Sequence, residues 1–325
     1  MSRRRIFTSV LAVAALMAAS ACGGDDPLAE DSGGSGDSDA NADKGSIVVG
    51  GQDFTEMQIM ASIYELMLTD AGYDVQTKLV STRDVYLPDL KAGKIDIVPE
   101  YAGSITDELQ AQENGPNAPQ VSSNDIGETM TALNKLLEAQ QLVALEPAEA
   151  TDQNAFAVTT DFAEQNQLET LSDLGELGEP VTLAASEDCA QRPDCAVGLK
   201  KTYGLEIAKV LPLGFGSQQT KDSVIEGEAQ LGLVGTSDGS LEELGLVILE
   251  DDKGLQVSQN LVPVVSQQAL QDNPDLEGIF NELSSALTTE DLAELNAAVD
   301  LQRQKPADVA QQYLADEGLI ARARA

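Results

Sequence analysis

The sequence predicts an α/β protein with a largely parallel sheet and helices on both of its faces. Short apolar runs alternate along the chain with segments whose apolar residues recur at helical spacing. The same alternation begins again after a change of register near Thr151. Strands that alternate with helices in this way are typical of βαβ units.

The first half supplies three strands and two helices. Thr55, with Gln58 three residues later, predicts a capping box at a helix start, and Gly72 predicts the helix end. A second helix is expected at 85–91, before Gly93. The expected strands lie at 47–49, 75–80 and 95–98.

The second half repeats this pattern and then becomes helical. Strands are expected at 155–158, 181–184, 231–234 and 261–265. Helices are expected at 198–203 and 220–226, followed by three in the tail at 276–287, 289–301 and 306–314.

A local pattern recurs at an offset of 134 residues. Residues 93–97 and 227–231 both run from a helix end through Gly and a charged residue into a strand. At this offset Tyr101 corresponds to Gly235, and Ser104 to Asp238. Two units of similar build would each send a loop into a shared cleft beyond the strand ends. The alternative is a chance likeness between two helix-to-strand turns.

The N-terminus predicts an export signal at residues 1–21. Three arginines precede a short apolar run at 6–18, and Ala19, Ser20 and Ala21 fit a small-residue cleavage site before Cys22. Cys22 is expected to be acylated, although Ala19 stands where a lipobox usually has Leu. An ordinary secretory cleavage site is the alternative. The arginine pair before Ile6 also leaves open the twin-arginine route.

Residues 22–45 predict a disordered, lipid-anchored tether. This segment consists largely of Gly, Ser, Asp and Ala. Its spaced acids resemble a calcium loop, but Lys44 and Gly50 stand where that loop needs Gly and Glu. Ordered structure is expected to begin at Ser46.

The charge and the residue types exclude several functions. The formal net charge is −36, and about −39 once the three N-terminal arginines are removed. This charge argues against nucleic acid or an anionic membrane as a partner. The chain has no histidine, which removes the commonest general base and the usual zinc sites, so neither metal nor cofactor is expected. Glu56, Asp96, Glu100 and Asp238 could form acid pairs by coincidence, and no catalysis is expected from them.

Cys189 and Cys195 predict a local disulfide in an exported protein. They enclose five residues, and an acylated Cys22 would leave them as a pair. The bridge would stiffen a loop near the rim of the cleft. Metal binding by the two thiols is the alternative.

Two motifs carry a resemblance to a known family. Residues 50–56 read GGQDFTE, and residues 95–104 read IDIVPEYAGS. They resemble the Lys-Asn-Phe-Thr-Glu and Pro-Glu-Tyr-Thr-Gly-Thr motifs in substrate-binding proteins of osmoprotectant ABC importers, which handle glycine betaine, choline and carnitine. Further family-like motifs occur in order at 172–174, 198–205, 237–239, 249–253 and 263–265.

The resemblance implies a type II periplasmic-binding-protein fold with two α/β lobes. One lobe would hold residues 46–151 and 262–325, and the other residues 152–261. Two crossover segments, near 151–153 and 258–262, would act as the hinge.

The resemblance also implies a ligand site from which most aromatic rings are missing. Family members hold a trimethylammonium group among aromatic rings through cation–π attraction. Tyr101 occupies one such position, with a core tyrosine as the alternative. Asn154, Gly235 and Gln259 stand where the family often has tyrosine. The polar replacements favour a polar zwitterion or polyol-like solute, and a bulkier betaine stays open.

Arg83 has two interpretations. It lies where the family chain passes the cleft and could fork onto a ligand carboxylate. The alternative is a surface arginine that pairs with Asp84 or another of the many acids. The candidate ligand-binding residues are Gln52, Phe54, Arg83, Tyr101, Ser104, Asn154, Asp238, Gln259 and Asn260.

These features together predict an extracytoplasmic solute-binding lipoprotein of an ABC importer. It would be a monomer without enzymatic activity that closes around a small solute and delivers it to a permease subunit. A sensor or scavenger that drives no uptake is one alternative, and a hydrolase on the same scaffold is another.

Overall fold

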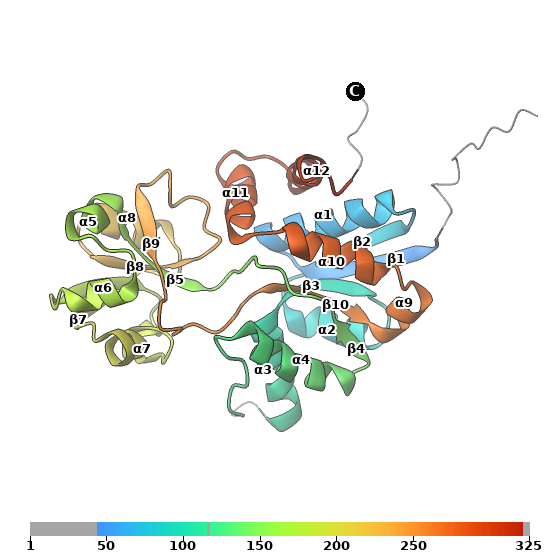
Figure 1. Cartoon of the computed structure of the whole chain (residues 1–325), viewed down its shortest axis with the longest axis horizontal. Helices are drawn as coiled ribbons and strands as arrows, with labels where there is room; N and C mark the ends of the chain where they lie inside the picture. The colour runs from blue at the N-terminus through green and yellow to red at the C-terminus, as the bar shows by residue number, and fades with distance from the viewer. Residues whose placement is uncertain (1–43, 116–117, 321–325) are drawn as a thin grey trace, which may run out of the picture. The chain divides into compact units, whose positions relative to one another are not determined.

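The computed structural model describes residues 44–115 and 118–320 (Figure 1). The expected signal segment, Cys22 and the tether up to residue 43 therefore lie outside the described residues. No helix within these two ranges is long and apolar enough to cross a bilayer.

The first sheet has five strands in the order β2-β1-β3-β10-β4. β1 pairs in parallel with β2 and β3, whereas β10 is antiparallel to both of its neighbours, β3 and β4. The sheet is therefore mixed: four strands run in one direction, in agreement with the expected largely parallel sheet, and only β10, which returns late in the chain, runs against them. The bounds are β1 Ser46–Gln52, β2 Asp74–Val80, β3 Ile97–Tyr101, β4 Leu142–Ala144 and β10 Leu261–Ser266.

Helices cover both faces of this sheet (Figure 1). One apolar cluster joins α1, α10, α11 and α12 to alternate residues of the strands, and a second joins α2, α3 and α4 to the opposite face. Alternation of side chains along a strand explains how one sheet serves two cores. The bounds are α1 Thr55–Asp70, α2 Arg83–Lys91, α3 Ala102–Asn114, α4 Ile126–Glu138, α9 Gln267–Asp272, α10 Leu276–Ala286, α11 Thr289–Asp300 and α12 Pro306–Asp316.

Helix α1 lies at the centre of the first core. Its residues Ile59 and Ile63 are fully buried, and its Tyr64 ring packs against Phe280 of α10 with centroids 4.5 Å apart. The expected capping box is wrong in its detail. Phe54 is the N-cap residue and makes no side-chain cap bond, while Thr55 donates its hydroxyl to Asp300.

The second sheet has five strands in the order β7-β6-β8-β5-β9. β6 is parallel to β7 and β8, and β5 is antiparallel to β8 and β9. The bounds are β5 Asn154–Thr159, β6 Val181–Ala185, β7 Ile207–Pro212, β8 Leu231–Gly235 and β9 Leu246–Leu249. Its helices are α5 Thr160–Asn166, α6 Leu171–Glu176, α7 Ala196–Gly198 and α8 Gln218–Ile225, with a 3₁₀ turn at Cys189–Gln191 and a π-helical turn at Leu199–Tyr203.

The two sheets share one strand order and one set of parallel and antiparallel pairings. β3 and β8 both occupy the third position, and adding 134 to the bounds of β3 gives the bounds of β8. The recurring pattern in the sequence therefore marks two units of similar build. Tyr101 and Gly235 end corresponding strands.

Two backbone segments join the sheets and run side by side (Figure 1). We call residues 145–153 the first crossover and residues 250–260 the second. Thr151 forms an antiparallel bridge with Asn260, and the Asp152 amide donates to the Gln259 carbonyl at 3.2 Å. This pairing holds both crossovers close to the end of β3.

Helix α3 begins in direct contact with the second crossover. A Cβ at Gly103 would lie 2.6 Å from the Ser258 carbonyl oxygen, so only glycine fits here. The close approach lets the Gly103 amide donate to that carbonyl at 3.0 Å. The end of β3, the start of α3 and the second crossover are thereby packed tightly against one another.

Candidate functional site

A cavity of about 890 Å³ lies beside the crossovers and is lined by residues attached to both sheets. Six of the nine expected ligand-binding residues line it: Gln52, Arg83, Tyr101, Ser104, Asn154 and Gln259. The cavity wall also includes Asp152, Arg192, Phe215 and Gln256, which the sequence analysis did not name.

A smaller cavity of about 380 Å³ shares Asp152 and Phe215 with the first. Two further expected residues, Phe54 and Asp238, line this second cavity. The ninth, Asn260, is used inside the crossovers, where its side-chain amide donates to the Ala148 carbonyl at 2.8 Å.

Arg83 forms a bidentate ion pair with Glu100. Its Nε and Nη2 atoms donate to the two carboxylate oxygens at 2.8 and 2.7 Å. Glu100 is 1% exposed and also accepts a hydrogen bond from the Tyr86 hydroxyl. Burial, followed by the charge of Glu100, raises the pKa of Tyr86 far above its ordinary value. Arg83 thus pairs with the buried Glu100 and is not a surface arginine, because it is largely buried and lines the cavity.

Tyr101 connects the cavity to a buried network. Its hydroxyl donates to Glu56 of α1, and Asn296 of α11 donates to the other oxygen of Glu56 at 2.7 Å. The same Asn296 amide group donates to the Ser237 carbonyl, beyond β8, at 3.1 Å. Burial, followed by the charges of Glu56 and Asp152, raises the pKa of Tyr101 well above its ordinary value. Tyr101 is therefore a neutral hydrogen-bond donor to a buried carboxylate.

Asp152 lies on the first crossover where the two cavities meet. Burial, followed by the charges of Glu56 and Asp238, raises its pKa to about 7, against a lowering by its hydrogen bond with Ser237. A Cβ at Gly235 would lie 3.1 Å from Asp152 Oδ1 and 3.4 Å from Phe215 Cζ. The absence of a side chain at Gly235 lets this carboxylate and this ring edge face the same small space.

Ser104 and Gln259 are joined by two hydrogen bonds in the cavity wall. The Ser104 amide and hydroxyl donate to Gln259 Oε1 at 3.0 and 3.1 Å. The Ala102 amide donates to the Asn260 carbonyl at 2.9 Å. Together with the bond from Gly103 to Ser258, these contacts occupy the first N–H donors of helix α3 with acceptors from the second crossover.

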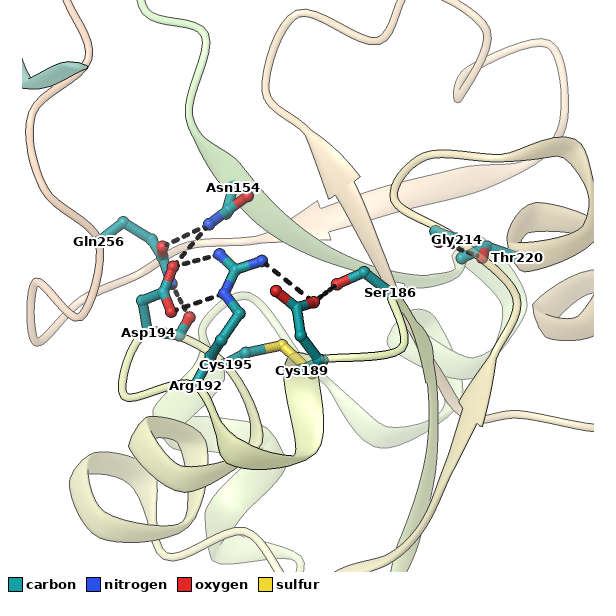
Figure 2. The surroundings of a disulfide bond; sticks show 10 residues. Asn154, Ser186, Cys189, Arg192, Asp194, Cys195, Gly214, Thr220 and Gln256 are labelled. Carbon is teal, nitrogen blue, oxygen red and sulfur yellow. Dashed lines mark hydrogen bonds and ion pairs between the residues drawn. A yellow bond between two sulfur atoms is a disulfide. The ribbon is translucent and has the colours of Figure 1, made fainter. Parts of the chain in front are cut away.

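The disulfide-closed loop drawn in Figure 2 contributes Arg192, Pro193 and Asp194 to the cavity wall. Cys189 and Cys195 are bonded, with their Cα atoms 5.2 Å apart. Inside the loop, Arg192 pairs with Asp194. Asn154 Nδ2 donates to the Asp194 carboxylate at 3.0 Å, and Gln256 Nε2 donates to the Asp194 backbone carbonyl at 2.8 Å. Both hydrogen bonds are drawn in Figure 2. The loop thereby fixes the side chain of Asn154.

The charge of Asp238 is balanced by an ion pair within the second cavity. Its carboxylate accepts from Lys221 Nζ of α8 at 2.9 Å and from the Ser240 amide and hydroxyl. Lys221 also donates to the Ser240 hydroxyl at 2.7 Å. Asp238 therefore contributes a fixed ion pair to the wall.

Two residues of the cavity wall that were not predicted, Asp152 and Phe215, are marked by weak signals in the sequence. Asp152 immediately follows Thr151, where the pattern changes, and Phe215 lies between two glycines with positive φ angles of 108° and 54°. Glycines of this kind mark a tight loop that can expose a ring. Phe215 is 50% exposed.

The chain belongs to the family described as the substrate-binding domain of the ABC-type glycine betaine transport system, which matches residues 45–316. A glycine-betaine-binding protein of Pseudomonas aeruginosa is 28% identical over 289 residues, which is 84% of this chain and 88% of that protein. The glycine betaine-binding protein YehZ of Escherichia coli is 28% identical over 285 residues, which is 84% of this chain and 90% of that protein.

A solved structure supports the same family. Apo YehZ from Escherichia coli has a TM-score of 0.72 and 26% identity, with 84% of this chain and 99% of that chain covered. The two mixed five-stranded sheets and this similarity identify a type II periplasmic-binding-protein fold. The family and these relatives are binding proteins of transport systems and not enzymes.

The geometry around Glu100 predicts a large, partner-dependent effect on stability. Arg83→Gln leaves a buried carboxylate without its cation, so we expect the free energy of unfolding to fall by about 3 kcal/mol. Arg83→Gln combined with Glu100→Gln removes that carboxylate and should recover at least half of the loss. Urea denaturation measures both.

Arg303→Gln, at an exposed arginine, is the matched control and should change stability by less than about 0.5 kcal/mol. Equal losses in the single and the double variant would show that Arg83 does not act by neutralising Glu100.

Proposed function

We propose that this chain is the solute receptor of an ABC importer for a small, osmoprotectant-like nitrogenous solute. The observation that carries the proposal is the cavity of about 890 Å³, whose wall combines Tyr101 at the end of β3 with crossover residues and the disulfide-closed loop. Membership of the betaine transport family and the names of the relatives support it.

The proposed mechanism is closure about the two crossovers. These segments are short, paired through their backbones, and the only covalent links between the sheets within the described residues. A solute that contacts both walls binds the closed arrangement more tightly than the open one and shifts the population towards it. The residues proposed to contact the solute are Gln52, Phe54, Tyr101, Ser104, Asn154, Asp152, Phe215 and Gln259.

In this proposal, the closed receptor delivers its solute to a permease subunit in the cell membrane. The receptor works as a monomer outside the cytoplasm, held at the membrane by a lipid on Cys22. The disposition of Arg3, Arg4 and Arg5 before an apolar run, with small residues before Cys22, supports export and anchoring.

Binding should be detectable as thermal stabilisation and should depend on Tyr101. The panel for the purified domain from residue 44 onward comprises choline, glycine betaine, carnitine, ergothioneine, amino acids, polyols and sugars. A ligand at 100 times its Kd should stabilise the domain by about 2.7 kcal/mol. Tyr101→Leu should weaken binding about tenfold, because one desolvated ring contributes about 1–2 kcal/mol to holding a cation.

Tyr73→Leu is the matched control for this measurement. Tyr73 is also buried and donates its hydroxyl to a carboxylate, that of Asp275, but it lies outside both cavities. Both variants should lose stability, and only Tyr101→Leu should lose affinity. Unchanged affinity in Tyr101→Leu, measured by calorimetry, would remove Tyr101 from the site.

The proposed anchor makes a separate prediction about localisation. Full-length protein with Cys22→Ser should leave the membrane fraction and enter the soluble exported fraction, because the lipid proposed on Cys22 supplies the membrane affinity and serine cannot carry it. Detergent phase partitioning measures this, with Cys189→Ser/Cys195→Ser as the cysteine control that should stay anchored. Retention of Cys22→Ser in the detergent phase would contradict acylation at this residue.

A further inference from the structure

The larger cavity offers a solute neutral amides more than free charges. Arg83 and Arg192, which line this cavity, are paired with Glu100 and Asp194. Among the residues that the structure describes, the wall also carries six side-chain amides, those of Gln52, Gln120, Gln153, Asn154, Gln256 and Gln259. Recognition of a solute therefore depends on which ends of these amides are free.

Gln259 presents a hydrogen-bond donor whose orientation the backbone fixes. Its Oε1 atom accepts from the Ser104 backbone amide at 3.0 Å and from the Ser104 hydroxyl at 3.1 Å. A backbone N–H can only donate, so the reverse orientation of the Gln259 amide would set one N–H against another. Nε2 is therefore the free end of this amide, and it has no hydrogen-bond partner among the described residues.

Asn154 presents an acceptor that is fixed through one further amide. Gln256 Nε2 donates to the Asp194 backbone carbonyl, which can only accept, so Gln256 Oε1 is left as an acceptor. Asn154 Nδ2 donates to this oxygen at 3.3 Å and to the Asp194 carboxylate at 3.0 Å. Figure 2 shows the three side chains in contact. Asn154 Oδ1 is therefore the free end, with no hydrogen-bond partner among the described residues.

Both free atoms can be reached from the cavity. Within residues 44–115 and 118–320, the side-chain polar atoms that are buried without a partner are Asn296 Oδ1 and Tyr313 Oη. Gln259 Nε2 and Asn154 Oδ1 also lack a partner but are not buried, and both residues line the larger cavity. Closure about the two crossovers would exclude water from them, so a solute that leaves either one unpaired would bind more weakly.

The two free ends select the chemistry of the solute, because one accepts and the other donates. A trimethylammonium group can pair with neither, and a carboxylate can pair only with the donor. A hydroxyl group both donates and accepts. A site that bonds a solute hydroxyl discriminates strongly against the analogue without it, because the polar groups of the site are then left unpaired.

We propose that Asn154 and Gln259 make the receptor specific for a hydroxylated solute. The solute hydroxyl donates to Asn154 Oδ1, and an oxygen of the solute accepts from Gln259 Nε2. The inference rests on the proposed function and narrows its ligand class to hydroxylated nitrogenous solutes. Neither residue needs a charge for this role, which suits a cavity whose arginines are already paired.

Pairs of solutes that differ only at a hydroxyl test the proposal. The probes are carnitine with γ-butyrobetaine, choline with propyltrimethylammonium, and threonine with 2-aminobutyrate. In the second pair a methyl group replaces the hydroxyl. Calorimetry on the purified exported protein should show the hydroxylated member of at least one pair binding about tenfold more tightly than its counterpart.

The outcomes separate this inference from the proposed function. Equal or tighter binding of the hydroxyl-free member in every pair that binds would overturn the hydroxyl specificity and leave the receptor function intact. Silence of all three pairs would overturn it as well. If glycine betaine then binds, the receptor function stands, and if the whole thermal-shift panel is silent, both proposals fail.

Gln259→Glu tests the donor with a change of one heavy atom. Glutamate keeps an oxygen for Ser104 and places a second oxygen where Nε2 was, so an oxygen of the solute would meet an acceptor. Binding of the preferred solute should weaken about tenfold or more. Gln120→Glu is the matched control, because it adds the same charge at an exposed position of the same wall, and it should change the affinity by less than about threefold. Equal effects of the two variants would contradict the donor role of Gln259.

Asn154→Leu tests the acceptor while nearly preserving the shape of the side chain. The affinity for the hydroxylated solute should fall to about that of its hydroxyl-free counterpart, whose own affinity should hardly change. A merely structural effect would weaken both members of the pair equally. Gln153→Leu removes the neighbouring amide of the wall and should keep the preference. A preference that persists in Asn154→Leu, or that is lost in Gln153→Leu alone, would contradict the acceptor role of Asn154.

Discussion

The backbone pairing of the two crossovers is the constraint on which the candidate site depends. The chain leaves the first sheet after β4, builds the whole second sheet, and returns as β10 between β3 and β4. Because Thr151 pairs with Asn260 and Asp152 with Gln259, both passages run together past the end of β3. This places a carboxylate and an amide from distant parts of the sequence beside Tyr101.

Much of the fold could be predicted because its signals are local. The apolar runs marked β1, β3 and β8, and the offset of 134 residues marked the correspondence of β3 with β8. The antiparallel direction of β10 could not be predicted, because a buried strand has the same apolar composition in either direction. Strand β7 was missed because none of its residues is buried. Its residues are half-buried or exposed, so no continuous apolar run marks the strand in the sequence.

Residues of the candidate site could be predicted only where they belong to a recognisable sequence motif. Gln52 and Tyr101 end strands, and Ser104 lies in the first turn of the helix that follows β3. All three belong to family-like motifs, so their place near the cavity follows from topology. The partner of Arg83 could not be chosen among 55 acids without three-dimensional contacts. Phe215 belongs to no motif, and its contact with the space beside Gly235 arises only when β7, β8 and the first crossover come together.

The protonation of Asp152 makes the stability of the empty protein depend on pH. Its pKa is about 7 in the fold against an ordinary value of 3.8, so the folded state holds the proton more tightly than the unfolded chain. The contribution of this group to stability is therefore fully present below pH 3.8 and is lost as pH rises to about 7. At neutral pH and above, the empty site holds a desolvated charge near Glu56 at a cost in stability.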